Sequence, residues 1–170
     1  MKTKGEIPMS KYIFRNVNRI GEKEYQTVMD GQELAQMWEN GVITYNPEIQ
    51  RGVKIKRGKD NTETEVPVYS KAHVRKICEA MLSGQYFTDM ITLNILSDGS
   101  ERIEYDEEGN LIVDGEIDIA DGQHRIRALA MILEGNEKGD LAFDLSELKF
   151  PVKITNYDVQ TAQQQFHQFS

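Results

Sequence analysis

The segment Asp121–Arg125, with the sequence DGQHR, gathers the groups best suited to chemistry in this chain of 170 residues. It follows an apolar run at 117–120 and precedes apolar residues at helical spacing, so a strand is predicted to lead directly into a helix. The first turn of a helix has free N–H groups and a partial positive charge, and Gly122 lets a ligand approach the backbone closely. The segment therefore predicts an anion site, with phosphate as the natural ligand.

The side chains of this segment offer several roles. Arg125 and Arg127 add permanent positive charge, and His124 can donate a hydrogen bond or move a proton. Gln123 can bond to sugar, base or backbone, and Asp121 can cap the helix or hold a metal ion. The residues alone leave a second interpretation open, in which Asp121 is merely the N-cap of the helix, Gln123 and Arg125 are solvated, and His124 packs on the surface.

The DGQHR string resembles the signature of the DGQHR-domain proteins, which include the DndB family of DNA phosphorothioation systems. These proteins are related in fold to the ParB/sulfiredoxin superfamily, where a shorter Gly-x-His-Arg motif opens the same helix and contacts nucleotide phosphates. Gly122, His124 and Arg125 occupy the matching positions. The segment 45–52 resembles the upstream Asn-Pro…Gln-Arg segment of such proteins, and the resemblance implies that Gln50 and Arg51 belong to the site, with Arg51 facing the ligand across a cleft.

A weaker resemblance extends the match toward the end of the sequence. The run 150–155 and the glutamine-rich segment that ends at Ser170 are similar to the strand and helix that follow the motif in this family. The resemblance then spans roughly residues 42–170 of a single domain, 1–170, with 1–41 as a family-variable part. Because the amphipathic pattern of the last segment continues to Ser170, we expect the chain to be a piece of a longer protein.

The resemblance implies a nucleotide-binding, ATP-hydrolysing, DNA-associated protein of a bacterial or phage DNA-modification or defence system. DNA and proteins of such a system are the implied partners. Asp121 and His124 are the candidate catalytic groups. The candidate ligands of ATP or another nucleoside triphosphate, with or without Mg²⁺, are Gln50, Arg51, Gly122, Gln123, His124 and Arg125. Two alternatives stay open: a non-catalytic DNA-binding transcriptional regulator, and a metal-dependent ParB-like nuclease that would use the acidic residues between 101 and 118.

The overall charge limits how the chain can meet nucleic acid. Its formal net charge is −8 at pH 7. Proteins hold phosphate backbones mainly with Lys and Arg, and in this chain acidic residues outnumber these basic ones. A uniformly basic binding surface is therefore excluded. Any contact with DNA must be local. The basic residues between Arg51 and Lys59 are a candidate for such a contact, with a solvated loop as the equally open alternative.

Composition also indicates the cellular setting. The single cysteine, Cys78, falls on the apolar stripe of a predicted helix and is expected to be a core residue of a protein in a reducing compartment. No run approaches about 18 consecutive apolar residues, and the first ten residues lack the apolar core of a secretory signal, so a soluble, cytoplasmic protein is expected. The three histidines lack the spacing of a structural zinc site, and no metal ligand is assigned.

The elements that position the motif predict an α/β (α+β) fold, with a small mixed sheet flanked by helices. The ParB/sulfiredoxin type of this fold is implied by the resemblance. Helices are predicted after Asp30, from Ser70 to about Ser83, from Gly122 to Gly135, and at 159–169. Strands are predicted at 12–17 and 25–29 as an opening hairpin, at 42–45, at 91–96, 102–105, 111–113 and 117–120 as a β-meander, and at 150–155. The charged stretch 54–65 is predicted to be an exposed connection.

Overall fold

The computed structural model of the chain describes residues 11–50 and 53–169. Its elements are, in chain order, β1 (Tyr12–Phe14), β2 (Asn18–Gly21), β3 (Glu24–Asp30), α1 (Gly31–Glu39), β4 (Ile43–Thr44), β5 (Val53–Arg57), β6 (Glu63–Pro67), α2 (Lys71–Leu82), β7 (Ile91–Ile95), β8 (Arg102–Tyr105), β9 (Leu111–Asp114), β10 (Ile117–Asp121), α3 (Gln123–Glu137), a short 3₁₀ turn η1 (Leu145–Glu147), β11 (Lys149–Thr155) and α4 (Val159–Phe169). None of the helices among these described residues is long and apolar enough to cross a membrane.

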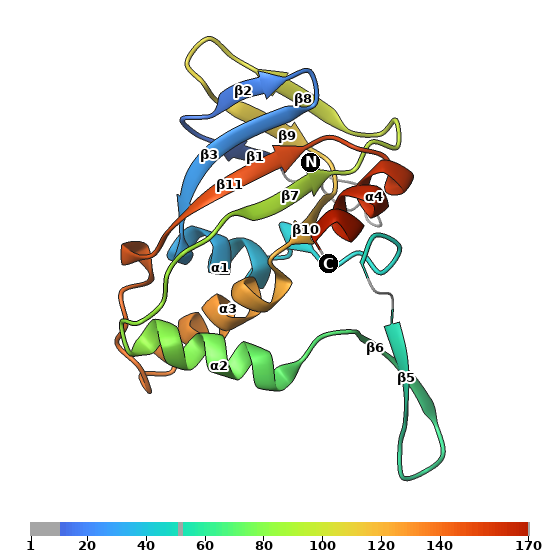
Figure 1. The fold of residues 1–170 in the computed structure, drawn as a ribbon, viewed down its shortest axis with the longest axis vertical. Coiled ribbons are helices and arrows are strands. Elements are labelled where there is room, and N and C mark those ends of the chain that lie inside the picture. The colour runs from blue at the N-terminus through green and yellow to red at the C-terminus, as the bar shows by residue number, and fades with distance from the viewer. Residues whose placement is uncertain (1–10, 51–52, 170) are drawn as a thin grey trace, which may run out of the picture.

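A six-stranded mixed sheet forms the centre of the molecule (Figure 1). Its strand order is β2-β3-β11-β7-β10-β4. The β11–β7 and β10–β4 pairs are parallel, and the other pairs in this sheet are antiparallel. A mixed sheet with helices packed around it confirms the predicted fold class, whereas the ParB/sulfiredoxin relationship stays an implication of the resemblance.

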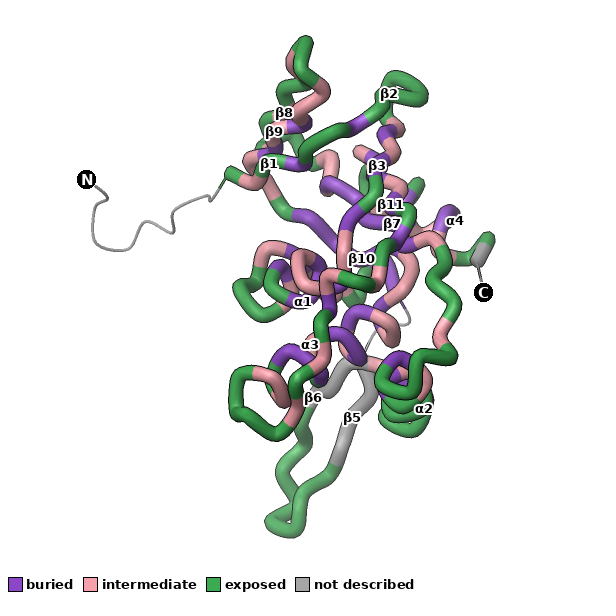
Figure 2. Tube along the Cα trace, turned by 90° about the vertical axis from the view of Figure 1, so that its left-hand side faces the viewer, coloured by how far each residue is buried: buried purple, intermediate pink, exposed green. Residues whose placement is uncertain are grey.

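One face of this sheet is apolar and carries the main helices. Ile91, Leu93 and Ile95 alternate along β7 and are fully buried, together with the neighbouring Val152 and Ile154 of β11. Side chains at every second position of a strand share a face. Helices α1 and α3 pack against each other under this face, and α2 packs on α3 (Figures 1 and 2). This packing fixes the start of α3 at the end of β10.

The opposite face is polar where helix α4 covers it. Asn94 of β7 is paired in register with Thr155 of β11 and with Asp118 of β10, and all three side chains are fully buried. Residues paired across strands lie on the same face of a sheet. Gln165 of α4 donates a hydrogen bond to Thr155 Oγ1 at 3.3 Å. Helix α4 therefore lies on a hydrogen-bonding surface rather than on an apolar one.

Two predicted strand pairings are wrong. The predicted meander is divided between two sheets, because β8 and β9 pair with β1 in a three-stranded sheet, β1-β9-β8, while β7 pairs directly with β10. The predicted opening hairpin is also different. Strand β3 pairs with β2 and not with β1, whose residue Phe14 faces Leu111 of β9. These pairings depend on contacts between residues far apart in sequence, which local patterns do not report.

The stretch 54–65, predicted to be an exposed connection between other elements, is itself part of a β-hairpin. Strands β5 and β6 pair with Arg57 opposite Glu63, and the two side chains form an ion pair at 3.1 Å. Gly58 and Thr62 close the turn through a backbone hydrogen bond of 2.9 Å, and Asn61 adopts a positive φ of 68°. The described tip is exposed and projects from the body of the molecule (Figures 1 and 2). The alternation of Val53 and Ile55 with Lys54 and Lys56 is the one local sign of a strand here, and it is too short to stand out among the surrounding charged residues.

The helix after the motif is longer than predicted. Its last residue is Glu137, so Gly135 lies inside α3 instead of ending it. A Cβ on Gly135 would lie 2.6 Å from Leu141 Cδ1. The glycine is therefore explained by the close approach of the following loop and not by a helix terminus.

Candidate functional site

The motif lies at the junction of β10 and α3. Gly122 is the N-cap residue of α3 and has φ 110°, a left-handed conformation that L side chains rarely adopt. It provides no side-chain cap for the first turn of the helix. Asp121 is the last residue of β10, so the interpretation of Asp121 as N-cap is wrong. The junction therefore leaves the first N–H groups of α3 without a side-chain acceptor, as an anion site requires.

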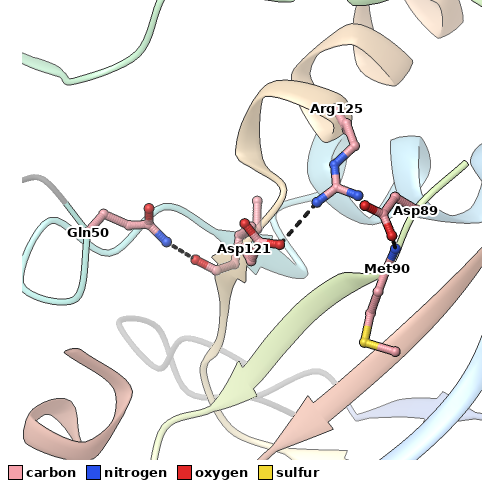
Figure 3. Close-up of polar contacts among 6 residues, drawn as sticks. Gln50, Asp89, Met90, Asp121 and Arg125 are labelled. Atoms are coloured by element: carbon pink, nitrogen blue, oxygen red, sulfur yellow. Dashed lines mark hydrogen bonds and ion pairs between the residues drawn. The ribbon is translucent and has the colours of Figure 1, made fainter. Parts of the chain in front are cut away.

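Asp121 and Arg125 form an ion pair across the junction, with 3.1 Å between Oδ2 and Nη2 (Figure 3). The Arg125 side chain is only 15% exposed, and its Nη1 is buried without a hydrogen-bond partner among the described residues. Burial raises the pKa of Asp121, although the charge of Arg125 opposes this. Figure 3 also places Asp89 beside the guanidinium of Arg125. The junction thus holds one buried cation between two carboxylates.

Gln123 and His124 connect the start of α3 to the segment before α2. Gln123 is buried, and its Nε2 donates to the Val68 carbonyl at 3.2 Å. His124 Nε2 accepts a hydrogen bond of 3.0 Å from the Ser70 backbone N–H. In a neutral imidazole this arrangement leaves the proton on Nδ1. The ring of His73 lies 4.9 Å from that of His124. Both motif residues therefore position α2 against α3.

Gln50 is buried and donates a hydrogen bond from Nε2 to the Ile119 carbonyl of β10 (Figure 3). This contact lies two residues before Asp121 in the strand. The structure thus brings the upstream matching segment next to the strand that delivers the motif. Arg51, which was predicted to face the ligand from the same segment, lies outside the described residues.

A buried carboxylate anchors the same upstream segment. Asp118 is fully buried and accepts hydrogen bonds from Thr44 Oγ1 at 3.0 Å and from Asn46 Nδ2 at 3.1 Å. Burial is the main cause that raises the pKa of Asp118 to about 7, and a hydrogen bond that the protonated carboxyl shares with Glu116 adds to it. Asp118 is one of the acidic residues that the nuclease alternative would use, but α4 and the segment after β4 cover this part of the sheet.

The raised pKa of Asp118 predicts a pH effect on stability. In the unfolded chain this carboxyl ionises near pH 4, and in the folded chain near pH 7, so its contribution to stability is lost as pH rises through 7. We expect wild type to lose about 2.5 kcal/mol of its stability relative to Asp118→Asn between pH 5 and pH 8, most of it below pH 7. Urea unfolding of both proteins at the two pH values measures this. Glu104→Gln, at an exposed carboxylate, is the control, and a difference that does not change with pH would contradict the prediction.

The sequence did not indicate several residues around the motif. Asp89 has no spacing relationship to the motif, yet it adds a second carboxylate beside Arg125. The Tyr86 hydroxyl has a pKa raised by burial, and the charge of Arg125 and a hydrogen bond to it act in the opposite direction. Both residues follow α2, and only the packing of α2 on α3 brings them to the junction. Among the described residues, no group of three or more His, Cys, Asp or Glu side chains is arranged to hold a metal ion.

Comparison with known proteins identifies a relative in a prophage. The SPbeta prophage-derived uncharacterized protein YopQ of Bacillus subtilis (strain 168) is 30% identical over 165 residues, which cover 92% of this chain and 35% of that protein. The chain therefore spans about a third of the length of this curated relative. No solved structure matches the chain. Residues 13–170 match the model of the family described as DndB, DNA-sulfur modification-associated, and the chain thus belongs to the DndB family.

Proposed function

We propose that this chain is the nucleotide-binding part of a DNA-modification-associated protein and that it holds nucleotide phosphates at the first turn of α3. The observation that carries the proposal is a set of donors without acceptors at one place. Gly122 leaves the helix start without a side-chain cap, and a Cβ on it would lie 3.1 Å from Arg125 Nη2. Beside it, Arg125 Nη1 is a buried donor with no partner among the described residues. A phosphate group could supply acceptors to both.

The segment at Gln50 supports a two-sided site. Its side chain binds the Ile119 carbonyl, so the segment that matches the family's Gln-Arg sequence lies next to the strand that carries the motif. Arg51 would then add a second cation to the site. Membership of the DndB family supports the association with DNA modification. The acidic charge of the chain supports a local rather than an extended contact with DNA.

The carboxylates at the junction fit a Mg²⁺ ion that arrives with the nucleotide. Mg²⁺ is usually held by one or two carboxylates together with substrate phosphates. Asp121 is one third exposed and Asp89 is exposed, and both lie beside Arg125 (Figure 3). These two residues would hold the ion, which would neutralise charge on the phosphates.

Hydrolysis of bound ATP is a further part of the proposal. It requires a group that orients the attacking water and cations that stabilise the transferred phosphoryl group. Asp121 and His124 are the candidates for the first role, and Arg125 for the second. The Nε2 atom of His124 is engaged by Ser70 N–H, so His124 would act through Nδ1. A phosphate-release assay separates hydrolysis from binding. Salt-sensitive DNA binding without phosphate release would instead favour the non-catalytic regulator.

Calorimetric titration of the chain with ATP, CTP and GTP in the presence of Mg²⁺ tests the phosphate site. We expect at least one nucleotide to bind and Arg125→Ala to weaken it by about tenfold or more, which corresponds to a loss of about 1.4 kcal/mol. Arg125→Lys keeps a positive charge and is expected to lose less affinity, because an ammonium cannot form the paired bonds of a guanidinium.

The control is Arg102→Ala, which removes an exposed arginine from β8 and changes the net charge equally. Urea unfolding confirms that each variant is folded, and Arg125→Lys replaces Arg125→Ala if the latter is not. The proposal is wrong if none of the three nucleotides binds, or if the Arg125 and Arg102 variants bind as tightly as wild type.

A further inference from the structure

A cleft lies between α1, α2 and α3, and neither Gly122 nor Arg125 is among its lining residues. Its volume is about 340 Å³, which is within the usual range for small-ligand sites of about 300–1,000 Å³. Aromatic, basic and apolar side chains form its walls, and the lining residues are Trp38, Tyr69, Lys71, Val74, Arg75, Arg127, Ala130, Met131 and Glu134. Consecutive residues of an α-helix are 100° apart, so Arg127 points to the opposite side of α3 from Arg125. The cleft therefore lies on the other side of α3 from the Asp121–Arg125 pair, and it adjoins the motif through Gln123, which bonds to Arg127, and through the Tyr69 ring, 6.5 Å from that of His124.

Aromatic rings surround a cation at the centre of the cleft. The Arg127 guanidinium carbon lies 3.9 Å from the centre of the Tyr69 ring and 4.8 Å from that of Trp38. Arg127 Nε donates to Gln123 Oε1 at 3.3 Å. Within residues 11–50 and 53–169, no carboxylate forms an ion pair with Arg127. This cation is therefore held in place by aromatic faces, and its charge is not neutralised by an acidic side chain.

The rim of the cleft is basic in a chain that is acidic overall. Lys71 and Arg75 are four residues apart on α2, so they lie on one side of the helix, and both are exposed. The acidic side chain in the lining, Glu134, forms an ion pair with Lys138 at 2.7 Å. The cleft therefore presents three cations and one carboxylate, and the carboxylate is paired with a lysine outside the lining. Its charge is complementary to an anion, in contrast to the net charge of −8.

We propose that this cleft binds a nucleobase together with its phosphate, as a mononucleotide or single-stranded nucleic acid presents them. A planar base extends the stack that the Arg127 guanidinium already forms with the rings of Tyr69 and Trp38. Lys71 and Arg75 contact the phosphate at the rim. The apolar side chains of Val74 and the half-exposed Met131 contact the flat face of the base. Every base has such a face, so this contact does not select one base over another. The proposal does not depend on the phosphate site at Gly122 and Arg125.

The fluorescence of Trp38 reports binding directly, because this is the single tryptophan of the chain. We titrate the chain with a twelve-residue thymidine oligonucleotide and, separately, with AMP. We expect quenching of Trp38 by at least one of them. Quenching by the oligonucleotide alone identifies single-stranded nucleic acid as the source of the ligand, and quenching by AMP identifies a free nucleotide. Inorganic phosphate is the third probe and is expected not to quench.

The double variant Lys71→Ala/Arg75→Ala tests the rim. We expect the dissociation constant to rise about tenfold, and the slope of log affinity against log salt for the oligonucleotide to become shallower by about 1. Arg102→Ala/Lys149→Ala is the matched control, because it removes two exposed basic residues on other elements and gives the same net charge. Tyr69→Leu keeps a bulky side chain and is expected to weaken binding through the loss of stacking. Absence of quenching with both the oligonucleotide and AMP, or equal weakening in the two double variants, would overturn the proposal.

Discussion

Replacing Gly122 with alanine is expected to lower the free energy of unfolding by about 2 kcal/mol and to abolish nucleotide binding at the junction. A residue other than glycine at φ 110° is strained, and such strain costs about 1–3 kcal/mol. The added Cβ would also lie 3.1 Å from Arg125 Nη2 and 3.1 Å from Ile91 Cγ1. It would therefore displace the guanidinium that pairs with Asp121. Urea unfolding and calorimetric titration measure the two effects.

The variant Gly84→Ala is the control that distinguishes the effect of backbone strain from the effect of the steric contact between the new Cβ and Arg125. Gly84 also has a positive φ, of 77°, but a Cβ there meets nothing within 4 Å. We expect this variant to lose stability through strain alone and to keep nucleotide affinity. The prediction is contradicted if Gly122→Ala is as stable as Gly84→Ala and binds nucleotide as tightly as wild type. The close approach of Gly122 to Arg125 would then contribute nothing to nucleotide binding.

Asn94→Ala is expected to destabilise the chain by about 3 kcal/mol, which makes it the most damaging polar substitution that we foresee. Asn94 is fully buried on the polar face of the sheet. Its Oδ1 accepts from Thr155 Oγ1 at 2.7 Å and from Tyr157 N–H at 2.9 Å, and its Nδ2 donates to the Tyr157 carbonyl at 3.0 Å. Alanine removes these three hydrogen bonds and leaves the Tyr157 N–H without its acceptor, and removing one partner of a buried hydrogen bond costs about 1–3 kcal/mol.

Equilibrium urea unfolding, followed by circular dichroism, measures the effect of Asn94→Ala. Asn40→Ala is the comparison, since Asn40 is exposed at the end of α1 and should change stability by less than about 0.5 kcal/mol. An unfolding midpoint of Asn94→Ala within error of that of Asn40→Ala would show that the hydrogen bonds of Asn94 do not hold β7 to the segment before α4.

The sequence predicted elements well where local signals coincide. Helix α2 has apolar residues at helical spacing and a Ser70 side chain that accepts a hydrogen bond from His73 N–H, as a sequence-predicted cap should. Asp30 likewise caps α1 by accepting from Glu33 N–H at 2.8 Å. The strand-to-helix change around the motif was also predictable, because an apolar run is followed at once by helical spacing. Each of these signals lies within a few residues of the element that it identifies.

Long-range packing determined what the sequence could not predict. Asp118 alternates with isoleucines in a pattern typical of a strand with one solvated face, but distant segments cover that face and bury the carboxylate. The motif identified Arg125, whereas Asp89 has no pattern that connects it with the junction. The cleft around Arg127 combines residues from three helices. A single sequence contains no signal for such convergence.

Helix α4 differs from α3 in what holds it to the sheet. Helix α3 buries four large aliphatic side chains, those of Ile126, Leu129, Ile132 and Leu133. The buried side chains of α4 among the described residues are those of Ala162 and Gln165. At about 25 cal/mol for each Å² of apolar surface, little hydrophobic free energy is lost when α4 leaves the sheet, and water can replace its hydrogen bonds. Local opening of α4 is therefore the least costly way to give solvent access to the polar face above Asn94 and Asp118, while α1, α2 and α3 keep the core closed.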